Sequence, residues 1–172
     1  MRQWLVDPKL LCQQHLLGER TEILMTIGTL QMGWSIDGYL RDKLLEPSKL
    51  RSRFKELTSE MIRRKLNPIA TLRDQYELKS YDKETRKWLP NGQVRTMEEL
   101  VAPYPGPYVD PIENIYELSA RCFDCRKRMI AVFMGLGYDE NWKYLHEMDR
   151  RGHIRTNDMS YVCTSYRKVI KR

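Results

Sequence analysis

The chain has 172 residues, 30 Lys and Arg against 23 Asp and Glu, a formal net charge of +7 and a pI near 9.3. This length is enough for one core without disulfide or metal staples, so we expect a single compact domain over 1–172. The positive charge favours a polyanionic partner, nucleic acid before an anionic membrane surface. No apolar run approaches the ~18 residues that span a bilayer, and residues 1–4 do not begin a signal peptide. We expect a soluble, cytoplasmic protein with no membrane partner.

The first predicted helix spans about 7–32 and opens with Asp7-Pro8, an N-cap residue followed by proline at the first helical position. On this helix His15, Glu19 and Glu22 recur at i, i+4 and i+7, so they share one face. A surface helix does not need an imidazole and two carboxylates on one side, and this face is therefore a candidate site. A structural, hydrogen-bonded His15 and a solvated or paired Glu19 remain alternatives.

A second helix is predicted over 49–65, where Leu50, Phe54, Leu57 and Met61 form a regular apolar stripe. The same stretch holds seven basic residues against two acidic ones, which predicts a strongly positive outer face that binds DNA or is simply solvated. The basic residues are Lys49, Arg51, Arg53, Lys55, Arg63, Arg64 and Lys65.

Residues 67–109 interrupt this periodicity. Pro68, Pro90 and Asn91-Gly92 are turn formers, so we expect a long ordered loop between helices two and three, with a short helix near 96–100.

A third helix is predicted to begin at Asp110-Pro111, with Glu113 completing a capping-box-like start. Its apolar stripe continues to about 133 and includes both Cys122 and Cys125. A shorter fourth helix is expected over about 138–151. The predicted fold class is therefore all-α, with three main helices and a shorter fourth.

The segment Cys122-Phe123-Asp124-Cys125 is a CxxC motif, which is half of a zinc site. The other two ligands would have to come from Cys163, His146 or His153, and no pattern places those residues nearby. Because the helical stripe already explains both thiols, we interpret them as small, reduced core side chains and expect no metal and no cofactor.

The segment from Gln14 to Glu22, QHLLGERTE, is similar to the QHLxxExxE signature of the phage pyrimidine-dimer DNA glycosylase/AP lyase family of the endonuclease V type. It also lies at the same short distance from the chain start. Residues 50–64 resemble the family's basic second helix, and Ser119-Ala120-Arg121 resembles its third helix more weakly. The resemblance implies a monomer that acts on duplex DNA in a bacterial or phage-infected cell.

In that family an N-terminal α-amine attacks C1′ of the target nucleotide, expels the base and forms a Schiff base. An α-amine suits this step because its reference pKa is about 7.7–8.0, against about 10.4 for a lysine side chain. A nearby carboxylate assists departure of the base and takes the proton whose loss leads to β-elimination. The resemblance assigns these roles to Met1 and Glu22. We expect the N-terminal segment to bring Met1 close to Glu22, and Met1 to be retained before the bulky Arg2.

Departures from the family pattern concern DNA contacts. Thr21 and Met25 replace two family arginines that hold the distorted DNA, and Cys125 replaces a basic position next to Arg126. Arg2 matches a phosphate-contacting arginine, with an exposed terminal charge as the alternative. The residues expected to contact substrate are Arg2, His15, Glu19, Arg51, Arg53, Lys55, Arg63, Arg64, Arg121 and Arg126.

Two other functions remain open at this stage. One is an enzyme of the same fold that cleaves RNA or hypermodified nucleotides, and the other is a basic DNA-binding protein without catalysis.

Overall fold

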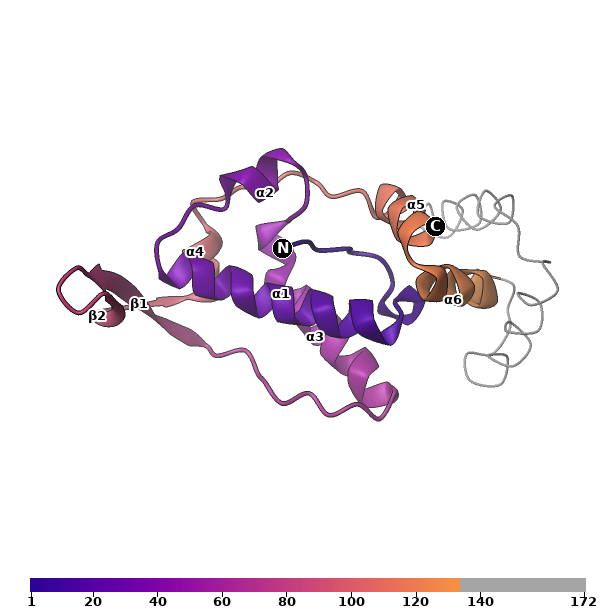
Figure 1. The fold of residues 1–172 in the computed structure, drawn as a ribbon, viewed down its shortest axis with the longest axis horizontal. Coiled ribbons are helices and arrows are strands. Elements are labelled where there is room, and N and C mark those ends of the chain that lie inside the picture. The colour runs from indigo at the N-terminus through magenta and orange to yellow at the C-terminus, as the bar shows by residue number, and fades with distance from the viewer. Residues whose placement is uncertain (134–172) are drawn as a thin grey trace. The chain divides into compact units, whose positions relative to one another are not determined.

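The structure is a computed structural model that describes residues 1–133, and it contains helices and one two-stranded sheet (Figure 1). The all-α expectation is wrong, because an antiparallel hairpin occupies part of the predicted loop, which makes the fold a mixed α/β one. The expected helix over 138–151 lies outside the described residues.

The chain forms two compact units. The first consists of Met1–Gln3 and Leu17–Val109, and the second of Trp4–Leu16 and Asp110–Arg172, of which 110–133 are described here. Among the described residues, no helix combines the length and the apolar character that crossing a bilayer requires.

The predicted first helix is divided in two. The 3-10 helix η1 (Pro8–Leu10) is capped by the Asp7 side chain, which accepts a hydrogen bond from the Lys9 N–H at 3.0 Å. Leu11 then adopts an extended conformation, and α1 (Gln13–Gln31) begins after it. Asp7-Pro8 is thus a genuine cap, but of a shorter element than expected.

In the first unit, α2 (Asp37–Arg41) and η2 (Pro47–Lys49) precede α3 (Leu50–Arg63). The predicted stripe of α3 is confirmed, because Leu50, Phe54, Leu57 and Met61 are all buried. The core of this unit also includes three residues of α1 at i, i+4 and i+7, namely Ile23, Ile27 and Leu30.

A buried ion pair joins α1 to α3. Arg53 donates two parallel hydrogen bonds to the Glu19 carboxylate, each 2.8 Å long, and only 3% and 0% of the two side chains is exposed. Buried charges are expensive unless they are paired in this way. Glu19 and Arg53 therefore lie inside the unit, and the expectation that they contact DNA does not hold.

The hairpin consists of β1 (Gln75–Asp82) and β2 (Lys87–Thr96). Glu77 faces Val94 but Lys79 faces Pro90, so β2 has extra residues between these pairs and bulges there. The bulge accommodates Pro90, which has no N–H to donate to the neighbouring strand. Gly92 adopts a φ of +80°, a conformation that glycine accepts readily. Pro90 and Asn91-Gly92, which favoured a loop, are therefore residues of an irregular strand.

The sequence did not predict the hairpin because its strands are mostly exposed. Tyr76 is the one buried residue of the two strands, so the apolar alternation of a half-buried strand is missing. Trp88 packs its ring against Tyr81 and against Trp34, with both centroid distances 5.4 Å. The short helix α4 (Met97–Val101) follows β2 as predicted, with a capping box at Thr96.

In the second unit the predicted third helix is two helices, α5 (Pro111–Arg121) and α6 (Phe123–Phe133). The Asp110 side chain caps α5 by accepting from the Ile112 N–H at 2.8 Å, as expected. Cys122 interrupts the helix with an extended conformation, φ −123° and ψ 108°. Its sulfur accepts a hydrogen bond from the Cys125 N–H at 3.4 Å, which substitutes for the missing helical partner at the start of α6.

We expect Glu19→Leu to lower the free energy of unfolding by ~3–5 kcal/mol, because it leaves the buried Arg53 without its main partner. Arg51→Met is the matched control, because Arg51 pairs with Glu98 near the surface. The Arg51 side chain is 28% exposed and the Glu98 side chain 64%. That control should cost less than about 1 kcal/mol. Urea unfolding measures both values, and equal losses would contradict a stabilising role for the buried pair.

Candidate active site

The start of the chain lies beside Glu22 in the first unit. The Arg2 backbone N–H donates a hydrogen bond to Glu22 Oε2 at 2.6 Å. One turn further along α1, the Thr26 hydroxyl lies 2.8 Å from the Glu22 carbonyl oxygen and 3.3 Å from Met1 Sδ. Met1, Arg2 and Glu22 are all half-buried. The first residue is therefore held against the turn of α1 that carries the carboxylate.

Residue 3 anchors this segment. The backbone N–H of Gln3 donates to the Leu44 carbonyl at 2.8 Å, and its side-chain oxygen accepts from the Glu46 N–H at 2.7 Å. Gln3 is 1% exposed, so these bonds form away from competing water. The chain start is a fixed part of the first unit.

This geometry brings together an amine and a carboxylate. The Met1 α-amine precedes the Arg2 N–H by one residue, a span of at most ~3.6 Å. A carboxylate that binds the Arg2 N–H therefore lies in the immediate neighbourhood of the amine. Such a pair can perform nucleophilic attack and proton transfer at one substrate atom and its neighbours.

The basic residues of α3 differ in their availability. Lys55 and Arg63 are exposed, and Arg63 also pairs with Glu60 at 2.7 Å. Arg51 pairs with Glu98 at 2.6 Å, and Arg64 pairs with Glu60 at 2.7 Å. Of the α3 cations predicted to contact DNA, Lys55 and Arg63 are thus the most accessible.

A pocket of about 520 Å³ lies along α3, and Arg51, Lys55 and Arg20 form its basic part. The Arg20 guanidinium stacks on the Phe54 ring at 4.3 Å and donates to Thr58 and to the Ala70 carbonyl. Met1 and Glu22 do not line this pocket. Arg20 was not among the predicted site residues, because it occupies an unspecified position of the motif directly after Glu19.

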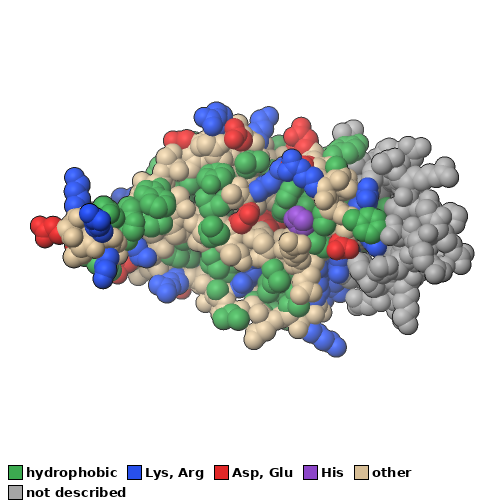
Figure 2. Space-filling view, viewed as in Figure 1, with side chains coloured by type: hydrophobic (Ala, Val, Ile, Leu, Met, Phe, Trp, Pro, Cys, Tyr) green, Lys and Arg blue, Asp and Glu red, His purple; other side chains and the backbone are tan. Residues whose placement is uncertain are grey.

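The hairpin adds basic residues that the sequence analysis also left without a role. Figure 2 shows Lys and Arg side chains on the hairpin of β1 and β2, with few acidic ones among them. The exposed basic residues of the two strands and their turn are Lys79, Lys83, Arg86, Lys87 and Arg95.

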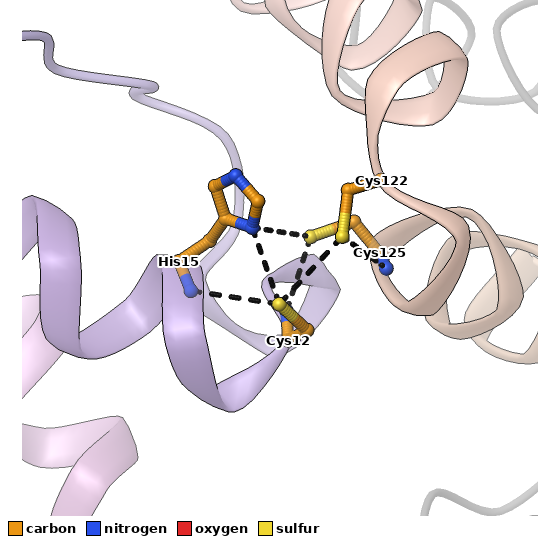
Figure 3. Close-up of side chains that lie close together, drawn as sticks. All are labelled: Cys12, His15, Cys122 and Cys125. Atoms are coloured by element: carbon orange, nitrogen blue, oxygen red, sulfur yellow. Dashed lines mark hydrogen bonds between the residues drawn. The ribbon is translucent and has the colours of Figure 1, made fainter.

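The remaining predicted residues belong to the second unit. Arg121 is exposed and pairs with Glu117 at 2.8 Å, and Arg126 stacks on the Phe123 ring at 5.3 Å. His15 lies among three cysteine thiols (Figure 3).

In this cluster the His15 Nδ1 lies 3.2 Å from Cys12 Sγ and 3.5 Å from Cys125 Sγ, and Cys122 Sγ lies 3.8 Å from Cys12 Sγ. The hydrogen bond from Cys125 lowers the pKa of the Cys12 thiol below its ordinary range, and contacts with His15 act in the same direction. Cys125 is buried in the core as expected and Cys122 is half-buried, and both sulfurs also belong to this polar cluster. The ligands considered from the sequence, Cys163, His146 and His153, lie outside the described residues.

Of the comparisons with known proteins, one found a match. Residues 1–74 match the model of a family described as pyrimidine dimer DNA glycosylase. This match confirms the resemblance seen in the sequence, and it includes Met1, Glu22 and all of α3 while ending before β1. No curated protein and no solved structure matches the chain.

We expect affinity for duplex DNA to fall steeply as salt rises, because phosphate contacts release counterions. Lys55→Gln should reduce the slope of log affinity against log salt by about 1. Glu56→Gln, which removes an opposite charge at the next position, should not weaken binding. Fluorescence anisotropy with a labelled duplex measures these slopes, and salt-independent binding would count against an electrostatic interface.

Proposed function

We propose that this protein is a DNA glycosylase with AP lyase activity, which excises damaged pyrimidines, pyrimidine dimers foremost, from duplex DNA. The observation that carries the proposal is the hydrogen bond from the Arg2 N–H to Glu22, which holds the chain start beside the carboxylate that matches the family's catalytic glutamate. The family match over residues 1–74 and the net charge of +7 support the same substrate class.

In the proposed first stage the unprotonated Met1 amine attacks C1′ of the damaged nucleotide. The bond from C1′ to the base breaks, and the base leaves with its bonding electron pair and takes up a proton. The amine nitrogen then loses a proton as the sugar ring opens, so the C1′–O4′ bond breaks, O4′ becomes a hydroxyl and C1′ forms a protonated Schiff base.

In the second stage Glu22 removes a proton from C2′, which the neighbouring Schiff base makes acidic. The electron pair forms a C2′–C3′ double bond, and the C3′–O bond breaks to release the phosphate of the next nucleotide. Water then hydrolyses the Schiff base and frees the amine. The Arg2 N–H orients the carboxylate for these transfers, and its negative charge stabilises the cationic sugar that develops when the base departs.

The lesion must leave the base stack for C1′ to reach a half-buried amine. The accessible cations Lys55 and Arg63 would neutralise backbone phosphates, and Arg2 would contact a phosphate close to the reacting sugar. That the protein is a monomer in solution stays a prediction.

Blocking the N-terminal amine tests the nucleophile. Reductive methylation at the terminal amine to the tertiary amine, or a retained N-terminal tag, should abolish the adduct that borohydride traps with abasic duplex DNA. DNA binding should remain, because phosphate contacts do not use the amine. Protein taken through the same procedure without the aldehyde is the control for damage. Normal cleavage of abasic DNA by the blocked protein would exclude the Met1 amine as the nucleophile.

Replacing Glu22 tests the proposed role of its carboxylate. Glu22→Gln keeps the side-chain volume and removes the base, so strand cleavage at an abasic site should slow by roughly 10²-fold or more. Glu84→Gln, which removes an exposed carboxylate in the hairpin turn, is the control and should leave the rate unchanged. Single-turnover cleavage of an end-labelled duplex gives both rates, and an equally active Glu22→Gln protein would exclude the proposed role.

A further inference from the structure

We propose that Cys12, His15, Cys122 and Cys125 form a structural Zn²⁺ site in the second unit. Their ligand atoms all lie within 4.8 Å of one another, and Figure 3 shows the three sulfurs and the imidazole nitrogen pointing toward a common centre. This proposal is independent of the glycosylase chemistry, which uses Met1 and Glu22.

The separations of the ligand atoms fit a tetrahedral zinc ion. Zn–S bonds of about 2.3 Å and Zn–N bonds of about 2.0–2.1 Å place two sulfurs about 3.8 Å apart, and a sulfur and a nitrogen about 3.5 Å apart. The corresponding distances are 3.8 Å for Cys12 Sγ to Cys122 Sγ and 3.5 Å for Cys125 Sγ to His15 Nδ1. The third, Cys12 Sγ to His15 Nδ1, is 3.2 Å. These three separations are close to those of a tetrahedral site, and a contraction of the cluster from its largest separation, within 4.8 Å, would complete it.

Each cysteine sulfur also accepts a backbone hydrogen bond. The Cys12 N–H donates to Cys125 Sγ at 3.2 Å, the His15 N–H to Cys12 Sγ at 3.5 Å, and the Cys125 N–H to Cys122 Sγ at 3.4 Å. Donors of this kind stabilise negative charge on sulfur and orient the ligands of a metal. Zinc binds the thiolate, so the backbone favours the form that the ion requires.

The four ligands come as two half-sites of equal spacing. Cys12 and His15 are separated by two residues around the start of α1, and Cys122 and Cys125 by two residues around the start of α6. In each half-site the first ligand directly precedes its helix, and the second lies in the first turn of that helix. The break between α5 and α6 at Cys122 creates the second half-site, since it places the Cys122 sulfur where the Cys125 N–H donates to it at the start of α6.

The composition of the site indicates its role. Three thiolates and one imidazole complete a tetrahedral shell and leave no position open for water or substrate, as in structural rather than catalytic zinc sites. Ordinary core packing explains the burial of Cys12 and Cys125, but it does not explain why an imidazole nitrogen faces two sulfurs. The ion would join segments more than a hundred residues apart in the sequence and so stabilise this unit.

The proposal is tested first on the full chain, purified without a polyhistidine tag. Elemental analysis and native mass spectrometry should find one zinc per chain. Replacement by Co²⁺ should give the absorption of a tetrahedral thiolate site, together with sulfur-to-cobalt charge transfer. Removal of zinc by a chelator should lower Tm, and added zinc should restore it.

Variants locate the ion. Cys122→Ser and His15→Ala should each lose the zinc or bind it much more weakly, whereas Cys163→Ser should keep one zinc per chain because the four ligands are complete without it. If the ligand variants fail to fold, the Co²⁺ spectrum of the wild-type chain still tests for a tetrahedral site with three thiolates. A wild-type chain that binds no zinc under reducing conditions, a disulfide between cluster cysteines in freshly reduced protein, or zinc retained by Cys122→Ser would overturn the proposal.

Discussion

The hydrogen bond from the Arg2 N–H to Glu22 is the constraint on which this account of the protein depends. A chain terminus normally moves freely, and a mobile amine would make a poor nucleophile because catalysis requires fixed geometry. Here Gln3 is buried and hydrogen-bonded on both its backbone and its side chain. The terminus therefore has the positional order of an internal residue while keeping the chemistry of an α-amine.

The motif that suggested a single polar face serves several structural purposes. Glu22 meets the chain start, Glu19 forms a buried ion pair with Arg53, and His15 faces three thiols in the second unit. Helical spacing predicted that these side chains share one side of a helix, but it carried no information about the partner of each. Apart from Cys12, which is three residues from His15, those partners are between 20 and 110 residues away in the sequence, and only the folded chain brings them together.

The sequence predicted the buried α3 stripe, the cap at Asp110 and the short helix near 96–100. The sequence did not predict the hairpin, because its exposed strands lack the apolar alternation that marks a half-buried strand. Charge patterns cannot distinguish a solvated arginine from a buried, paired one such as Arg53. The half-site formed by Cys12 and His15 has the same spacing as the CxxC motif, and that shared spacing was the available clue to the cluster.

The most direct test of the central claim is to identify the atom that bonds to DNA. Wild-type protein is trapped on an abasic duplex with borohydride and digested with protease and nuclease, and tandem mass spectrometry then locates the sugar remnant. The account predicts that the remnant is on the α-nitrogen of Met1, in the peptide that contains Arg2. A remnant on a lysine side chain, or the absence of any adduct from protein that cleaves the same duplex, would contradict it.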